Sequence, residues 1–145
     1  MDGFELVGDE GDVREGLSEY VLRDRSPIVV VRRDGQPIRA LGGRCAHKLG
    51  EMPLGDIEDG GRDGAAGCSV VCPRHRKRFP GGLRFDVVDG RAFLAPGPDG
   101  KAPPCDEFDG SWRLAVYEVK VVDSKVFVSS KPVSAGSGKQ GGCEL

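Results

Sequence analysis

Short apolar runs, many of them rich in valine, alternate along the chain with turns built from Gly, Pro and Asp. Two such runs flank Asp34-Gly35 and two more flank Asp89-Gly90, and an Asp-Gly pair in that position predicts a β-hairpin with a type I′ turn. Residues 113–122 include a two-residue alternation of apolar and charged side chains, which is typical of a half-buried strand. Because β-branched side chains favour strands over helices, the pattern predicts an all-β protein. The expected strands cover residues 4–7, 28–33, 37–41, 68–71, 83–88, 91–94, 113–122 and 126–128.

The remaining residues contain one undecided segment, one predicted loop and a predicted C-terminal tail. The apolar residues within 17–22 fit either a strand or one helical turn, and both stay open. Residues 58–67 are nearly all Gly, Asp, Arg and Ala, which predicts an exposed loop. From residue 131 the chain is rich in Ser, Gly and Lys, which predicts a flexible tail over 131–145. A chain of 145 residues suits one hydrophobic core, so we expect residues 1–130 to form a single domain.

Charge and hydropathy exclude several classes of function. The chain has 21 basic and 23 acidic residues, and this net charge of −2 gives no general basic field for nucleic acid. Its longest apolar runs are far too short to span a bilayer. The sequence starts without a secretory or amphipathic leader pattern. We therefore expect a cytoplasmic protein that binds neither nucleic acid nor a membrane.

Each of the two histidines lies close to a cysteine, in Cys45-Ala46-His47 and in Cys72-Pro73-Arg74-His75. Five cysteines without a leader do not suggest a disulfide framework, so ligation of a metal or cluster is the first interpretation. Two thiolates and two imidazoles suit a [2Fe–2S] cluster in which histidines replace two cysteines on one iron. Two loops that each supply one thiolate and one imidazole can hold such a cluster from opposite sides.

A mononuclear zinc ion held by the same four side chains is the chemical alternative. Common zinc modules place their ligands as C-x₂₋₄-C and H-x₃₋₅-H rather than as one mixed pair in each loop. The spacing therefore favours the cluster over zinc. The other three cysteines, Cys68, Cys105 and Cys143, are interpreted as ordinary residues of a strand, a Pro-rich loop and the tail.

The two Cys/His segments resemble the cluster-binding motifs of Rieske [2Fe–2S] proteins, and are most similar to those of the soluble Rieske-type ferredoxins. The likeness rests on residues 45–50, with Pro53-Leu54 and 55–57 after them, and on residues 70–75 with Phe79. It implies an antiparallel β-sandwich over about residues 4–130 with an inserted cluster-binding subdomain. The implied cluster-binding loops span about residues 44–50 and 71–79, with Cys45 and Cys72 on the inner iron and His47 and His75 on the outer, solvent-facing iron.

Some positions depart from the respiratory branch of this family. Gly50 and Arg74 stand where that branch forms a disulfide, and Lys77 and Phe79 stand where its hydroxyl groups lie beside the cluster. Hydrogen bonds to the cluster and its ligands raise the reduction potential. Their absence implies a potential near the low end of the family range, about −150 mV. Arg76 follows His75 where the family usually has Gly.

The resemblance implies an electron carrier that passes single electrons between a reductase and an acceptor such as an oxygenase. Rieske oxygenases carry out their oxidation at a separate mononuclear iron with two histidine ligands, and here both histidines belong to the Cys/His pairs. We therefore expect no enzyme activity from the chain alone. An accessory Rieske-type subunit, similar to the small subunit of nitrite reductase, is the alternative function.

The two predicted cluster-binding loops are strongly basic. They carry six of the 21 basic residues and no acidic residue within 44–50 and 71–79, so the rest of the chain holds 15 basic against 23 acidic residues, a net charge of −8. Such polarity would steer an acidic partner surface towards the redox centre. We call these six residues the basic collar and predict that redox partners dock on it: Arg44, Lys48, Arg74, Arg76, Lys77 and Arg78.

Overall fold

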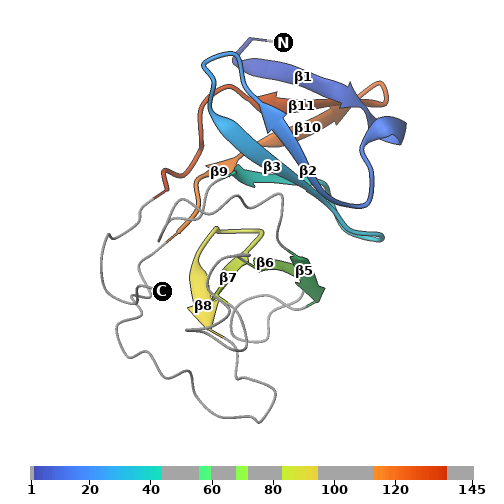
Figure 1. Ribbon diagram of the computed structural model, residues 1–145. Helices are drawn as coiled ribbons and strands as arrows, with labels where there is room; N and C mark the ends of the chain where they lie inside the picture. The colour runs from blue at the N-terminus through green and yellow to red at the C-terminus, as the bar shows by residue number, and fades with distance from the viewer. Residues whose placement is uncertain (1, 44–55, 60–67, 72–82, 95–112, 137–145) are drawn as a thin grey trace.

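The computed structural model describes residues 2–43, 56–59, 68–71, 83–94 and 113–136 (Figure 1). Its regular structure within these residues consists of antiparallel β-strands and one short 3-10 helix, η1. The elements are β1 (Phe4–Asp9), η1 (Glu10–Asp12), β2 (Gly16–Val21), β3 (Pro27–Arg32), β4 (Arg39–Gly42), β5 (Asp56–Asp59), β6 (Cys68–Val71), β7 (Leu83–Asp86), β8 (Ala92–Leu94), β9 (Val116–Tyr117), β10 (Val119–Val122) and β11 (Lys125–Ser129). The predicted all-β class is confirmed.

The strands form three sheets, with the orders β1-β11-β10, β2-β3-β4-β9 and β5-β6-β7-β8. Figure 1 shows the β2-β3-β4-β9 sheet between the other two. We call it the middle sheet, and we call β1-β11-β10 the terminal sheet and β5-β6-β7-β8 the inserted sheet. The inserted sheet interrupts the chain between β4 and β9, as the predicted β-sandwich with an inserted subdomain requires.

Strand β3 is buried on both faces, because the middle sheet is covered on both sides. Ile28 and Val30 pack into the core shared with the terminal sheet, whereas Val29 and Val31 pack into the core shared with the inserted sheet. All four side chains are at most 1% exposed. A continuous β-branched run suits this position better than an alternating pattern, since both faces of the strand meet apolar side chains. The run Ile-Val-Val-Val therefore links the two cores.

The type I′ turn lies at Asp123-Ser124 rather than at either of the two Asp-Gly pairs for which it was predicted. Asp123 and Ser124, between β10 and β11, both have positive φ, +52° and +63°, which is typical of a type I′ turn. At Asp34-Gly35 only Gly35 has positive φ, +79°, and the Gln36 nitrogen donates to the Arg33 carbonyl at 3.0 Å. This geometry is typical of a type II turn within a longer loop. The predicted hairpin is present, and its predicted turn type is wrong.

The turn between β7 and β8 is also longer than a type I′ turn. The Gly90 nitrogen donates to the Asp86 carbonyl at 2.8 Å, and the Val88 nitrogen donates to the Asp86 side chain at 2.7 Å. Gly90 has φ +74°, and its carbonyl accepts the Leu114 N–H at 2.8 Å. A Cβ at residue 90 would lie 2.3 Å from the Leu114 carbonyl oxygen. Glycine is therefore needed here for its conformation and for the close approach of residue 114.

Three further segments differ from, or complete, the expectations from the sequence. The apolar residues within 17–22 fitted either a strand or one helical turn, and the structure has a strand there, β2 (Gly16–Val21). The segment 113–122 contains two strands in different sheets, because the chain passes from the middle to the terminal sheet at Glu118. Glu58 belongs to β5 rather than to an exposed loop, since pairing with β6 outweighs the low strand propensity of acidic residues.

The first residues of the predicted tail contact the middle sheet. Val116 and Ser134 form an antiparallel bridge, and the Val133 nitrogen donates to the Val116 carbonyl at 2.8 Å. A Cβ at Gly136 would lie 2.9 Å from the Ala115 nitrogen. Residues up to 136 thus lie against the fold, and residues 137–145 are outside the described part. The boundary at residue 130 stays a prediction.

Replacing Gly90 by Ala should destabilise the protein more than replacing Gly35 by Ala. Both glycines have positive φ, which costs an L-residue about 1–2 kcal/mol, but a Cβ at Gly35 would have no neighbour within 4 Å. The contact with Leu114 should add about 1–3 kcal/mol of overpacking at Gly90. Urea unfolding of both variants measures the difference. Equal losses of stability would show that the Leu114 contact is unimportant.

Candidate cluster site

The predicted ligands lie outside the described residues: Cys45 and His47 fall within 44–55, and Cys72 and His75 within 72–82. In the described part of the chain, no group of three or more His, Cys, Asp or Glu residues is placed to hold a metal ion. The structure describes the strands that hold the ends of both ligand segments. These strands therefore determine where both ligand segments begin and end.

The inserted sheet brings the ends of the two ligand segments together. Val71, the last residue before Cys72, pairs with Asp56 on one side and with Arg84 on the other. Asp56 directly follows the first segment, and Leu83, beside Arg84, directly follows the second. Neighbouring strands lie about 4.8 Å apart, so these three chain ends fit within about 10 Å. Both Cys/His segments are consequently attached at the same end of one sheet.

The start of the first segment is fixed by close backbone contacts at the end of β4. The Gly42 nitrogen donates to the Ala115 carbonyl at 2.8 Å, and the Gly43 nitrogen donates to the Pro27 carbonyl at 2.9 Å. A Cβ at Gly43 would lie 3.0 Å from the Pro27 carbonyl carbon and 3.1 Å from the Ile28 nitrogen. The chain thus leaves a tightly packed point two residues before Cys45. This role of Gly43 was not predicted, although the Gly42-Gly43 pair before the motif was visible in the sequence.

Strand β6 leads directly to the second segment, and its own residues face a packed interior. Cys68 is 2% exposed and packs with Val70 and Phe85 in the core between the middle and inserted sheets. Its interpretation as a strand residue is confirmed. Ser69 is fully buried, and its hydroxyl group has no hydrogen-bond partner among the residues that the structure describes. Cys105 and Cys143 lie outside the described residues.

The pKa shifts resolved within the described residues concern Asp24 and Tyr117. Hydrogen bonds from Ser26 lower the pKa of the Asp24 carboxyl group at the turn between β2 and β3. Burial raises the pKa of the Tyr117 hydroxyl group, and the charge of Asp24 raises it further. Both groups belong to the middle sheet and the turn between β2 and β3.

Comparison with known proteins identifies the family. A family model of the Rieske [2Fe-2S] domain matches residues 4–103, a range that contains both Cys/His pairs. The chain belongs to the Rieske [2Fe–2S] domain family, and this domain binds a [2Fe–2S] cluster. The donor set of two thiolates and two imidazoles fits that cluster. No curated protein gives a significant match.

Solved structures share the fold at low sequence identity. A protein assigned as an NADH-dependent nitrite reductase small subunit from Mycobacterium tuberculosis has 19% identity and a TM-score of 0.64, with 87% of this chain and 93% of that chain covered. The ferredoxin of carbazole 1,9a-dioxygenase from Nocardioides aromaticivorans IC177 has 20% identity and a TM-score of 0.60, covering 88% and 98%. For apo dicamba monooxygenase the values are 19% and 0.61, covering 88% of this chain and 33% of that chain. At these identities the likeness concerns the fold.

Within the described ranges, no helix is long and apolar enough to cross a bilayer.

Replacing Gly43 by Ala should lower cluster content, because the new Cβ presses on the backbone of β3 and displaces the chain just before Cys45. Overpacking of this kind costs about 1–3 kcal/mol. We expect less iron per purified chain and a changed EPR spectrum of the reduced protein. Gly11→Ala is the matched control, since a Cβ there has no neighbour within 4 Å. Full iron content with an unchanged spectrum in Gly43→Ala would show that the contacts of Gly43 do not position the first ligand segment.

Proposed function

We propose that this protein is a Rieske-type ferredoxin that carries single electrons between a reductase and an acceptor such as an oxygenase. The observation that carries the proposal is the pairing of Val71 with both Asp56 and Arg84, which attaches both Cys/His segments at one end of one sheet. The bound cluster would supply one-electron transfer. The residues proposed to hold it are Cys45, His47, Cys72 and His75.

The histidine count supports a carrier over an oxygenase. Both histidines of this chain belong to the proposed ligand set, so none is left for a mononuclear iron site with two histidines. The work of the polypeptide is then to hold the four ligands and to offer a surface to its partners.

A second function is favoured by the likeness to the Mycobacterium tuberculosis protein assigned as a nitrite reductase small subunit, which has a TM-score of 0.64. In that case the chain would be an accessory subunit in a stable complex with a larger oxidoreductase. A carrier exchanges electrons in transient encounters, whereas an accessory subunit co-purifies with its partner. Gel filtration of the natively expressed protein separates these two cases.

Replacing any one of Cys45, His47, Cys72 or His75 by Ala should abolish or severely reduce cluster binding. The wild-type protein should be red-brown, hold two irons per chain and give a rhombic EPR signal after reduction. Cys68→Ala is the control, because Cys68 packs in the core rather than in either ligand segment. Iron analysis, visible absorption and EPR measure the result. A colourless wild-type protein with one zinc ion would support the zinc alternative instead.

The basic collar is the proposed docking surface for an acidic partner, and its six residues lie outside the described part. Arg76→Glu combined with Lys77→Glu should slow electron exchange with the reductase at low salt and flatten its salt dependence, since steering weakens as the Debye length shortens. Stopped-flow kinetics over a range of ionic strength measures both effects.

The control for this experiment is Arg14→Glu combined with Arg23→Glu, which makes the same change in net charge at exposed residues near the terminal sheet. Its exchange rate should stay close to that of the wild type. Equal rates for the collar variant and the wild type at low salt would exclude the collar as the docking site, whatever the identity of the ligands.

A further inference from the structure

Residues 131–136, which we call the C-terminal segment, follow β11 and lie along β9. The Val116 nitrogen donates to the Ser134 carbonyl at 2.9 Å, and the Val116 carbonyl accepts from the Val133 nitrogen at 2.8 Å. The preceding carbonyl, that of Ala115, accepts instead from the end of β4 at 2.8 Å. Because backbone groups in a strand alternate in direction, the C-terminal segment lies on the side of β9 that faces away from β4.

Ser129, the last residue of β11, directs the chain into the C-terminal segment. Its Oγ accepts from the Glu118 nitrogen at 2.9 Å and donates to the Lys131 carbonyl at 2.8 Å. A hydroxyl group can donate and accept at once, so this one side chain satisfies two backbone groups where the strand ends. Ser129 is only 7% exposed. The course of the C-terminal segment is therefore fixed at its start as well as at β9.

Two glycines approach the backbone of Ala115 closely. A Cβ at Gly42 would lie 3.4 Å from the Ala115 nitrogen, and a Cβ at Gly136 would lie 2.9 Å from the same atom. Gly136 does not have a positive φ, so glycine is needed there for the close approach alone. Gly42 belongs to β4 and Gly136 to the C-terminal segment. Ala115 thus contacts both through the same short stretch of backbone.

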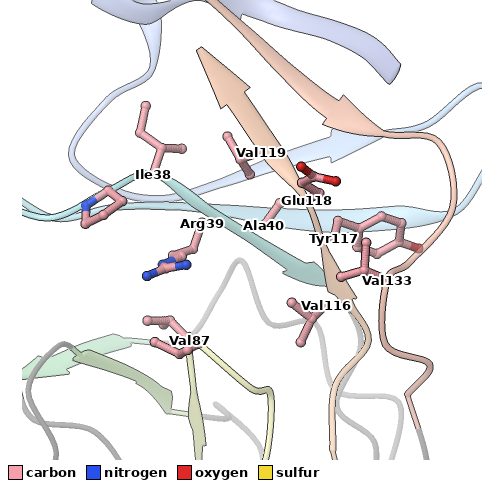
Figure 2. Close-up of a pocket in the computed structure, with 11 residues that line it drawn as sticks. Ile38, Arg39, Ala40, Val87, Val116, Tyr117, Glu118, Val119 and Val133 are labelled. Atoms are coloured by element: carbon pink, nitrogen blue, oxygen red, sulfur yellow. The ribbon is translucent and has the colours of Figure 1, made fainter. Parts of the chain in front are cut away.

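The inserted sheet meets the C-terminal segment at the same place. A pocket of about 440 Å³ is lined by Val133 of the C-terminal segment, by Val116 of β9 and by Val87, which follows β7 (Figure 2). The Leu114 nitrogen donates to the Gly90 carbonyl, in the turn between β7 and β8, at 2.8 Å. The chain that leads into β9 is therefore in contact with the middle sheet, the inserted sheet and the C-terminal segment.

We propose that the C-terminal segment is a positioning element of the redox site. It fixes Ala115, and Ala115 in turn fixes Gly42 through the hydrogen bond to its carbonyl. Gly42 lies three residues before Cys45, so its position relative to the inserted sheet affects how the two ligand segments meet at the cluster. Hydrogen bonds to the cluster and its solvent exposure set the reduction potential. This proposal rests on the proposed function, because it concerns the cluster that the carrier would use.

Gly136→Val in the full-length protein with its cluster tests the proposal. The added side chain separates the C-terminal segment from Ala115, whichever of the two moves. We expect iron release to a chelator to be at least about fivefold faster, as overpacking of this size allows. The reduction potential and the EPR g values of the reduced cluster should shift as well. Gly11→Val is the matched control, since a Cβ there has no neighbour within 4 Å.

Val133→Pro changes the same contact without adding bulk beside Ala115. Proline lacks the N–H that donates to the Val116 carbonyl, so the variant should shift the g values and speed iron release as Gly136→Val does. Val133→Ala keeps this N–H and removes only a side chain that is 64% exposed. It should behave like the wild type in iron release, potential and EPR.

Val126→Ala separates positioning from a general loss of stability. Val126 is fully buried in the terminal sheet, where it pairs with Val121, so its truncation should lower stability in urea without shifting the g values or the potential. Wild-type g values and iron release in Gly136→Val and Val133→Pro would overturn the proposal, and so would an equal shift in Val126→Ala. A wild type that holds no cluster would overturn the proposed function as well, whereas unchanged variants of a cluster-containing wild type would overturn this proposal alone.

Discussion

The pairing of Val71 with Asp56 on one side and Arg84 on the other is the constraint on which the proposed site depends. The two ligand segments are separated by β5, β6 and a loop in sequence, and only this register puts their ends side by side. A shift by one residue would move Cys68 and Val70 out of the core shared with the middle sheet and bring Ser69 and Val71 into it. The packing of Cys68 and Val70 therefore also fixes the register at which the second segment leaves β6.

The two segments start in different sheets, so their separation depends on how those sheets dock. The first leaves β4 of the middle sheet, and the second leaves β6 of the inserted sheet. Residues 114 and 115 contact both: Leu114 donates to Gly90 in the inserted sheet, and Ala115 accepts from Gly42 in the middle sheet. The packing of Val29 and Val31 against the inserted sheet supports the same arrangement. The relative position of the two points at which the segments begin is thus set by contacts outside the motifs.

Local patterns predicted the fold class and most strands, because β-branched runs and turn residues act over short distances. Strand β6 and the strands on either side of Asp123-Ser124 follow directly from such patterns. The turn types did not follow, since an Asp-Gly pair permits several turns and the flanking strands decide among them. The close contact of Gly43 with Pro27 was not predicted for a related reason. The two residues are far apart in the sequence, so no local pattern indicates that they meet. The four ligands were proposed from chemistry, and they stay a prediction.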